Sequence, residues 1–369
     1  AAAPLPGYPR VYALALTYLA REDYQVDPDR LVRYVLAYQR VQPLTLSEVW
    51  ALPVMLRLAL LEVLAIGAAH ITHEGSSEDA LAALRLQLQP IALPAERNPS
   101  LEDIVASAIP SMRQLDVYDW RQFSEHVSVV HQHLEQDPAG VYPYMDFETR
   151  NRYRSEIEEL ALHSAATEAE VAAAAVSLAA EAGRQHAVQL PPLQSTSEGA
   201  KDYPGLQLML PPNGHVGYYL IDAGRRQLET QLNYRAPIGT AARRWVLDHP
   251  TLVYLAPITL ITLLVLLLGS SYARAAGANW LELLVVNLLA AVPAITIGVM
   301  LTDLALPHFL PPRTLPKLSF IEGIPLQCST LVVIPGLIGG TAGIDDLFDQ
   351  LEQHYLRNPD PALRFALLT

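Results

Sequence analysis

The sequence predicts a mainly α-helical protein with a two-helix transmembrane hairpin, ending in the first βαβ unit of an α/β domain. Two apolar runs, residues 251–269 and 280–301, are each long enough to cross a bilayer as a helix. The residues before them carry apolar side chains at helical spacing, whereas residues 330–368 read as a strand, an amphipathic helix and a second strand. Hydrophobic residues make up 51% of the chain, and their concentration in these runs indicates membrane segments.

Composition narrows the class of protein. The chain has 369 residues, enough for two or three domains, and a formal net charge of −13. This charge argues against a non-specific nucleic-acid binder, which needs clustered Lys and Arg. The single cysteine, Cys328, excludes an intramolecular disulfide and suits a cytoplasmic location. Because the chain begins with Ala, lacks a signal-peptide pattern and stops just after a strand-like run, we expect a fragment of a longer polypeptide.

Residues 1–184 predict a helical cytoplasmic domain. Runs such as VYALALTYLA and LVRYVLAYQRV place apolar residues on one helical face. A third helix begins with a capping box at Thr45 and Glu48, and Leu44 and Val49 are spaced as a hydrophobic staple. The Ala-rich run EAEVAAAAVSLAAEAG predicts one long helix that ends near Gly183.

The third helix, from Val49 to Ala69, is also long enough for a membrane span. Arg57 and Glu62 lie in its middle, however, and Pro53 interrupts its first turns. A charge at the bilayer centre costs roughly 2.5–3.5 kcal/mol. We therefore expect a buried helix of the soluble domain, with a membrane span as the alternative.

The membrane part begins after residues 185–250, which read as a linker and juxtamembrane segment. Residues 251–301 form the predicted hairpin, whose helices are joined by the short loop SSYARAAGAN. Arginines crowd the flank before it, and further basic residues follow it, so the positive-inside rule places both ends in the cytoplasm. Residues 302–329 connect the hairpin to the last domain, 330–369. Two buried core helices are the alternative to a hairpin.

The segment TLVVIPGLIGGTAGIDDLFDQL, residues 330–351, raises the question of a phosphate-binding loop. It lacks the Lys-Ser/Thr pair of a P-loop and the spacing of a dinucleotide fingerprint. Asp345 and Asp346, expected in the first helical turn, would repel a phosphate there. We instead expect a βαβ unit of a parallel sheet, whose ligands bind beyond the carboxyl ends of the strands. The candidate binding residues at those ends are Ile334, Pro335, Gly336 and Thr369.

Other motifs have structural interpretations that we favour. Asp27-Pro28-Asp29 could in principle hold Mg²⁺ through its carboxylates, but we favour the N-cap of the helix that begins near Arg30. Among His126, His131 and His133, no two lie four apart on a helical face, so surface histidines are expected rather than a metal site. Arg243-Arg244-Trp245 superficially matches the acceptor-side motif of processive polysaccharide synthases, but it directly abuts a span and indicates a juxtamembrane anchor.

Four long stretches resemble the amino-terminal third of the cyclic β-1,2-glucan synthase family. They are LTLSEVWALPVMLRLALLE, VYDWRQFSEHVSVVHQHLEQDPAGVYPYMDFETRNRYRSEIEELA, HVGYYLIDAGRRQLE and LPKLSFIEGIPLQCSTLVVIPGLI, and the resemblance covers most of the chain. It implies a very large, multi-pass inner-membrane glycosyltransferase of Gram-negative bacteria. Such an enzyme uses UDP-glucose as donor, inverts the anomeric carbon and builds the glucan on a protein-attached intermediate.

The resemblance also assigns expectations to this chain. Residues 330–369 would begin a GT-A-like nucleotide-sugar transferase domain, with the strand end at Pro335 approaching the uridine. A divalent metal, Mg or Mn, is expected, but its ligands and the general base belong further along the polypeptide, so the catalytic residues are unknown and the fragment is expected to be inactive. The implied partners are UDP-glucose, the growing glucan, the lipid bilayer and the rest of the polypeptide, and nucleic acid is not among them. The amino-terminal region and residues from 302 onward would be cytoplasmic.

Several alternatives stay open. MDFETRNRYR is either an ion-paired helix start, which we favour, or a docking surface for the catalytic domain or the glucan. Asn287 either joins the membrane helices or lines a glucan path. The alternative function is a non-enzymatic, membrane-anchored helical scaffold or regulatory module. Core positions are favoured over sugar stacking or priming for Tyr142, Tyr144, Tyr218 and Tyr219.

Overall fold

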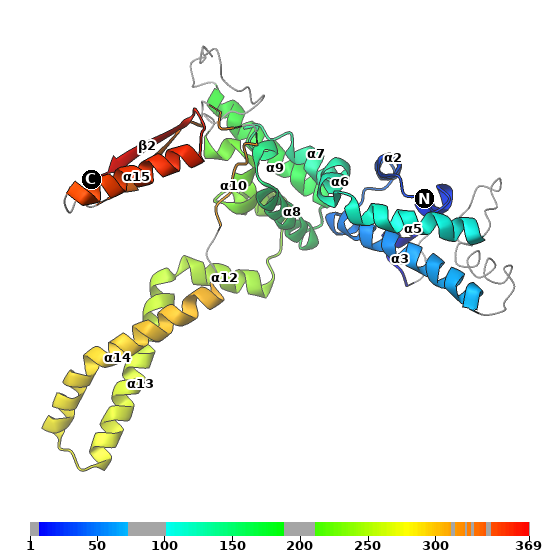
Figure 1. The fold of residues 1–369 in the computed structure, drawn as a ribbon. Coiled ribbons are helices and arrows are strands. Elements are labelled where there is room, and N and C mark those ends of the chain that lie inside the picture. Colours follow the sequence, from blue (N-terminus) through cyan, green and yellow to red (C-terminus); the bar gives the residue numbers. More distant parts are fainter. Residues whose placement is uncertain are drawn as a thin grey trace. The chain divides into compact units, whose positions relative to one another are not determined.

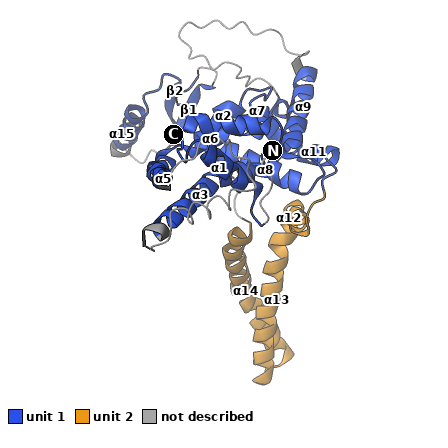
Figure 2. Ribbon diagram, turned by 90° about the vertical axis from the view of Figure 1, so that its right-hand side faces the viewer, with its two compact units in different colours: residues 1–234, 318–369 blue, residues 235–317 orange. Residues whose placement is uncertain are grey.

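The computed structural model describes residues 7–72, 101–187, 211–310, 314–321, 323–325, 328–336 and 341–368. The chain divides into two compact units, which Figure 2 colours blue and orange. Unit 1 comprises residues 1–234 and 318–369, and unit 2 comprises residues 235–317. The mainly helical prediction is confirmed, because helices make up most of both units.

A first group of helices forms the amino-terminal core of unit 1 (Figure 1). Its members are α1 (Arg10–Arg21), α2 (Pro28–Gln39), α3 (Leu46–Thr72), α5 (Leu101–Val117) and α6 (Trp120–Val127). The apolar faces predicted from helical spacing meet in one cluster, which includes Tyr12, Leu19, Leu31, Leu56, Leu60 and Phe123. Helix α3 contributes one face to this core.

The helix starts follow the sequence signals. Asp27 accepts hydrogen bonds from the backbone N–H groups of Asp29 (2.9 Å) and Arg30 (3.1 Å), so the predicted N-cap of α2 is confirmed. At α3, the Thr45 N–H donates to the Glu48 carboxylate at 2.8 Å and the Glu48 N–H donates to Thr45 Oγ1 at 3.2 Å. These reciprocal bonds confirm the predicted capping box.

Helix α3 packs one face into the core and leaves another exposed. Leu52, Leu56 and Leu60 are at most 1% exposed. The charges that argued against a span have partners, because Arg57 donates to Asp116 at 3.0 Å and Tyr12 donates to Glu62. The opposite face is apolar and exposed at Trp50, Val54, Leu58 and Leu61. By length and composition α3 is one of three helices in the described residues that are able to cross a membrane.

A second group of helices follows in unit 1. It consists of α7 (Val129–Leu134), α8 (Phe147–Leu162), α9 (Glu168–Ala187), α10 (Val216–Ile221) and α11 (Arg225–Gln231), with 3₁₀ turns at Tyr142–Tyr144 and Pro212–Gly214. Their shared core includes Tyr142, Tyr153, Ile157, Val171, Val216 and Leu228. The Ala-rich α9 runs past its predicted end at Gly183 to Ala187, because Gly183 is buried in the helix and the packing of α9 holds it helical.

The segment 185–250 differs from the predicted linker. Residues 188–210 lie outside the described residues, but α10 and α11 pack into the second core through Val216, Leu220 and Leu228. Unit 1 therefore extends to Tyr234, and the juxtamembrane part begins at Arg235. Helices α10 and α11 are each too short to show a helical period of apolar residues, which is why the sequence indicated a linker.

Unit 2 consists of α12 (Ile238–Asp248), α13 (Pro250–Ala275) and α14 (Trp280–Phe309). α13 and α14 lie side by side and are joined by residues 276–279 (Figure 1). At 1.5 Å per residue their 26 and 30 residues measure about 39 and 45 Å. Their surfaces expose Leu264, Leu267, Leu288, Leu289 and Val292 by more than half each, so they are not core helices of a globular unit.

Polar contacts and close packing join the two apolar helices. Asn287 Nδ2 donates to Ser270 Oγ at 2.8 Å. Of the two interpretations of Asn287, the structure supports the one in which it joins the two helices. Tyr254 donates to Asp303 at 3.2 Å near the other end of the pair. Between them the helices touch at Gly298, where an added Cβ would lie 3.0 Å from the Ile258 carbonyl oxygen. Glu282, the charge at the entry of α14, completes a capping box with Asn279.

The chain ends in a strand, a helix and a strand within unit 1. β1 (Thr330–Pro335) pairs in parallel with β2 (Leu363–Leu368), and α15 (Thr341–Arg357) connects them. The register runs from Thr330 opposite Leu363 to Pro335 opposite Leu368. Before β1, the Ser319 N–H donates to the Tyr144 carbonyl at 2.7 Å and ties the returning chain to the helical part of unit 1.

Candidate functional site

The predicted binding edge lies where β1 and β2 end together. Pro335 is the register partner of Leu368, so the two strand ends point to the same edge of the sheet. Ile334, Pro335 and Gly336 are therefore placed at this edge, whereas Thr369 lies outside the described residues. A ligand at this edge would meet backbone atoms and small side chains rather than charged groups.

Gly336 is fixed on two sides. Its N–H donates to the Leu368 carbonyl at 3.0 Å, which extends the sheet by one bond and leaves that N–H unavailable to a phosphate. A Cβ added to Gly336 would lie 2.7 Å from both terminal carbons of Leu347 on α15. A larger residue here would require the Leu347 side chain to move, because strand and helix approach closely.

The positions of the two aspartates correct one step of the sequence interpretation. Helix α15 begins at Thr341, and its first turn contains no acidic residue. Asp345 and Asp346 follow in the second turn, where both are exposed. The helix dipole acts mainly within the first turn. The two carboxylates therefore do not offset the positive end of the α15 dipole, although the sequence had led us to expect that they would.

A groove of about 460 Å³ lies between α15 and the start of β2. Its lining includes Phe348, Tyr355, Leu363 and Phe365. Leu363 is the first residue of β2, so the groove sits at the opposite end of the strand from Leu368 and the predicted edge. The groove and the predicted binding edge are therefore separate features.

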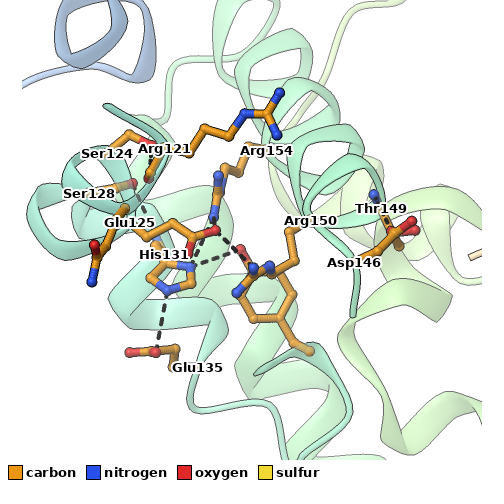
Figure 3. A network of polar contacts seen from close by, with 12 residues as sticks. Arg121, Ser124, Glu125, Ser128, His131, Glu135, Asp146, Thr149, Arg150 and Arg154 are labelled. Atoms are coloured by element: carbon orange, nitrogen blue, oxygen red, sulfur yellow. Dashed lines mark hydrogen bonds and ion pairs between the residues drawn. The ribbon is translucent and has the colours of Figure 1, made fainter. Parts of the chain in front are cut away.

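A buried ionic cluster lies between α6, α7 and α8, shown in Figure 3. Arg150 and Arg154 each donate to the same Glu125 oxygen at 3.1 Å. The side chain of Arg154 is 3% exposed, and neither guanidinium Nε has a hydrogen-bond partner among the described residues. The ion pairing predicted for MDFETRNRYR is thus present near the start of α8, with Glu125 of α6 as the partner of both arginines.

His131 belongs to this cluster, which corrects the expectation of a surface histidine. It is 6% exposed and receives hydrogen bonds at Nδ1 from Tyr142 (3.1 Å) and Arg154 (3.2 Å). Since both groups act as donors, Nδ1 is the acceptor, and Nε2–H faces Glu135 at 3.3 Å. Burial, together with Arg154 and Arg150, lowers the pKa of His131 to about 3, so the ring is neutral at physiological pH.

Sequence reasoning missed a second buried set. His215 Nδ1–H donates to Asp137 at 2.7 Å, and its Nε2 lies 3.1 Å from the Tyr153 hydroxyl. Asp137 also accepts from the Val216 N–H at 3.0 Å, so it holds the start of α10. Tyr153 is 1% exposed, so a substrate in solution cannot contact it. Asp137 and His215 are 78 positions apart, and no motif spacing could have linked them.

The tyrosines proposed as core residues divide by burial. Tyr142 is fully buried and Tyr219 is 3% exposed, so neither offers a ring face to a sugar. Tyr144 and Tyr218 are half-buried, and Tyr218 stacks edge-on against Tyr219 at 5.2 Å between ring centroids. These positions support core roles over sugar stacking for Tyr142 and Tyr219.

Comparison with known proteins finds a relative of this chain. The chain is 28% identical, over 98% of its length, to the cyclic beta-(1,2)-glucan synthase NdvB of Rhizobium meliloti (strain 1021). The resemblance found in the sequence is thereby confirmed. The chain spans 14% of the length of that relative, an extent consistent with an amino-terminal portion. No protein-family model matches the chain.

Proposed function

We propose that this chain is the amino-terminal part of a membrane-bound glycosyltransferase that makes cyclic β-1,2-glucan from UDP-glucose. The observation that carries the proposal is the similarity to a cyclic glucan synthase over 98% of the chain. This similarity includes the helical region, the apolar hairpin and the βαβ unit together, so it does not depend on one common element. The relative's membrane association agrees with the apolar helices α13 and α14.

In this proposal the edge at Ile334, Pro335 and Gly336 is the first wall of the donor site. Ligands of parallel α/β sheets bind beyond the carboxyl ends of the strands, and Pro335 and Leu368 end side by side. The described residues at this edge, Ile334, Pro335, Gly336 and Leu368, carry no charged side chain, which suits a uridine better than a diphosphate. The transferred glucose would then be attacked by a glucan hydroxyl with inversion at the anomeric carbon.

The divalent metal of such an enzyme, Mg or Mn, is proposed to bind to the remaining polypeptide. The described residues contain no group of three or more His, Cys, Asp or Glu placed to hold a metal ion. We therefore derive no step through a metal here. This chain supplies the membrane anchor and the beginning of the donor site, while the metal ligands and the general base lie on the remaining polypeptide.

The proposed location is the inner membrane of a Gram-negative bacterium. The arginines before α13 favour a cytoplasmic side for the amino-terminal region and for residues from 302 onward. The helical domain and the βαβ unit would then share one aqueous compartment, on the same side as the donor.

The test substitutes Gly336 in the polypeptide encoded by the whole gene. Gly336→Ala places a Cβ 2.7 Å from the terminal carbons of Leu347, so that side chain must move against the strand end. A change at the strand end that weakens donor binding by ~1.4 kcal/mol lowers the affinity for the donor tenfold. We therefore expect isolated membranes to incorporate about tenfold less labelled glucose from UDP-glucose. Gly336→Ala combined with Leu347→Ala should recover part of the loss.

Gly239→Ala is the matched control, because no atom lies within 4 Å of a Cβ added there. Unchanged incorporation and an unchanged KM for UDP-glucose in the Gly336→Ala variant would contradict the placement of the donor site. Membranes of the unsubstituted protein that produce no cyclic glucan would contradict the enzyme itself.

A membrane-anchored scaffold or regulatory module is the second candidate. It is favoured by the exposed apolar face of α3 at Trp50, Val54, Leu58 and Leu61, which is unusual for a helix that faces only water. The same membrane assay separates the two functions. A scaffold supports no glucose incorporation by the purified whole polypeptide, whereas the synthase does.

A further inference from the structure

Helix α12 contributes none of its residues to a core. It spans Ile238–Asp248, and no residue in it is buried. Ile238 is 89% exposed and Trp245 is 52% exposed. An isolated helix of 11 residues is marginal in water, so a helix of this length requires a surface to stabilise it.

The side chains of α12 are sorted by polarity except near its end, where Leu247 falls on the side of the arginines and Asp248 falls beside Ala241. At 100° per residue, Ile238, Ala242 and Trp245 fall on one side of the helix, with Ala241 beside them. Thr240, Arg243 and Arg244 fall on the other side. The apolar side is narrow and contains one aromatic residue next to the arginines, which is the composition of a helix that lies in a membrane interface.

The chain fixes α12 beside the hairpin. Only His249 separates the end of α12 from Pro250, the first residue of α13. His249 leaves the helical conformation at φ −122° and ψ 56°, and its Nδ1 lies 2.9 Å from the Trp245 carbonyl oxygen. Figures 1 and 2 show α12 running across the direction of α13. A helix turned in this way, next to a helix that enters a bilayer, lies along its surface.

The charge of the segment selects the kind of surface. Residues 235–249 hold Arg235, Arg243 and Arg244 against the single carboxylate of Asp248. This local excess of positive charge contrasts with the formal charge of −13 of the whole chain. Each Lys or Arg near an anionic bilayer contributes about 1 kcal/mol of attraction.

From these observations we propose that α12 is an interfacial helix that binds anionic phospholipid headgroups on the cytoplasmic side of the membrane. Its apolar side, with Ile238, Ala242 and Trp245, enters the boundary between headgroups and acyl chains, and its arginines contact the phosphates. The inference rests on the proposed function only in requiring that α13 and α14 span the bilayer. Continuity with α13 and the local positive charge favour lipid over a protein partner.

The test measures the depth of single labels in the full 369-residue chain. In a Cys328→Ser background, one cysteine is introduced at Ala242, at Thr240 or at Leu289, labelled with a nitroxide and reconstituted in bilayers. The bilayers contain phosphatidylcholine alone or with phosphatidylglycerol. Accessibility to oxygen, which concentrates in lipid, is compared with accessibility to a water-soluble nickel chelate.

With phosphatidylglycerol present, we expect the Ala242 label to be accessible to oxygen and the Thr240 label to the nickel chelate. The double variant Arg243→Gln and Arg244→Gln should lose the dependence on phosphatidylglycerol. Equal access of the chelate to both labels, or shielding of the Ala242 label from both reagents by protein, overturns the proposal. The Leu289 label reports on the hairpin separately, so its absence from the bilayer interior would contradict the span and not the interfacial helix alone.

Discussion

Arg154 and His131 occupy the interior of the helical domain, and their state there depends on neighbours. Arg154 lies between Glu125 and the ring of Phe147, with its guanidinium carbon 5.7 Å from the ring centroid. His131 stays neutral because its Nδ1 accepts from Arg154 and a proton there would face a cation. The protonation state of His131 therefore depends on its burial and on the neighbouring arginines, which its position in the sequence does not reveal.

The stability of the helical domain should depend on pH through His131. The unfolded chain takes up a proton near the ordinary pKa of 6.5, whereas folded His131 does so only at about 3. The unfolded state thus binds more protons between these values, and the free energy of unfolding falls as the pH is lowered from about 6.5. The contribution is at most ~1.4 kcal/mol per pH unit.

This pH dependence is measured by urea unfolding of the chain at several pH values from neutral to mildly acidic. His131→Gln keeps an acceptor for Arg154 but cannot be protonated, so its stability should fall less steeply. His126→Gln, at an exposed position, is the matched control and should keep the original slope. Identical slopes for His131→Gln and the unsubstituted chain would refute the assignment.

Glu125 is the counter-charge for both arginines of the cluster. Glu125→Gln leaves Arg150 and Arg154 without that carboxylate in the interior, and breaking a buried pair in this way costs about 3–5 kcal/mol. Thermal unfolding followed by circular dichroism should show a marked fall in Tm. Glu22→Gln, which removes one of the two carboxylate partners of the more exposed Arg30, should change Tm much less. Similar effects of the two substitutions would show that the cluster is not a buried charge network.

At the scale of elements, local signals placed most helix starts, and packing decided the ends. The capping residues Asp27 and Thr45 lie within three positions of the N–H groups that they bind, so the sequence alone reveals them. The end of α9 at Ala187 and the helices α10 and α11 depend instead on burial against distant residues. In the hairpin, an apolar run predicts each helix, but only the structure shows where they touch.

The contact at Gly298 makes a prediction about that hairpin. Gly298→Val adds a side chain whose Cβ would lie 3.0 Å from the Ile258 carbonyl oxygen. This substitution should therefore separate α13 from α14. In a Cys328→Ser background, cysteines replacing Ser270 and Asn287, whose side chains are hydrogen-bonded, should form a disulfide in membranes on mild oxidation. Gly298→Val should reduce the yield of that cross-link severalfold.

Gly269→Val serves as the control for the hairpin, because nothing lies within 4 Å of a Cβ added at Gly269. It should leave the cross-link yield unchanged. Equal yields for Gly298→Val and the unsubstituted chain would mean that the helices do not pack at Gly298 in the bilayer.

At the scale of the whole molecule, the βαβ unit is the least complete part of unit 1. Leu331, Val333 and Leu368 are 60%, 43% and 62% exposed, although both strands are mostly apolar and β1 is rich in β-branched residues. Two strands are marginal as a sheet, and a parallel sheet is normally covered on both faces. The strands therefore have the composition of a covered sheet without the layers that cover it within the described residues.

The isolated 369-residue chain should consequently be inactive. It contains one edge of the proposed donor site, and no described group of its side chains is placed to hold a metal. Purified chain in bilayers, incubated with labelled UDP-glucose and divalent metal, should transfer no glucose above background. Membranes containing the polypeptide of the whole gene are the positive control, and transfer by the chain alone would overturn the division of roles proposed above.

The sequence by itself determined the helical class, the capped helix starts, the apolar hairpin and the resemblance to cyclic glucan synthases. These features are written in neighbouring residues, since a helical period, a capping box or an apolar run is complete within a few turns. Only the tertiary structure decided that His131 and Arg154 are buried, that Asp137 meets His215, and that α10 and α11 belong to the core. Those outcomes depend on side chains far apart in the chain, whose contact and desolvation exist only after folding.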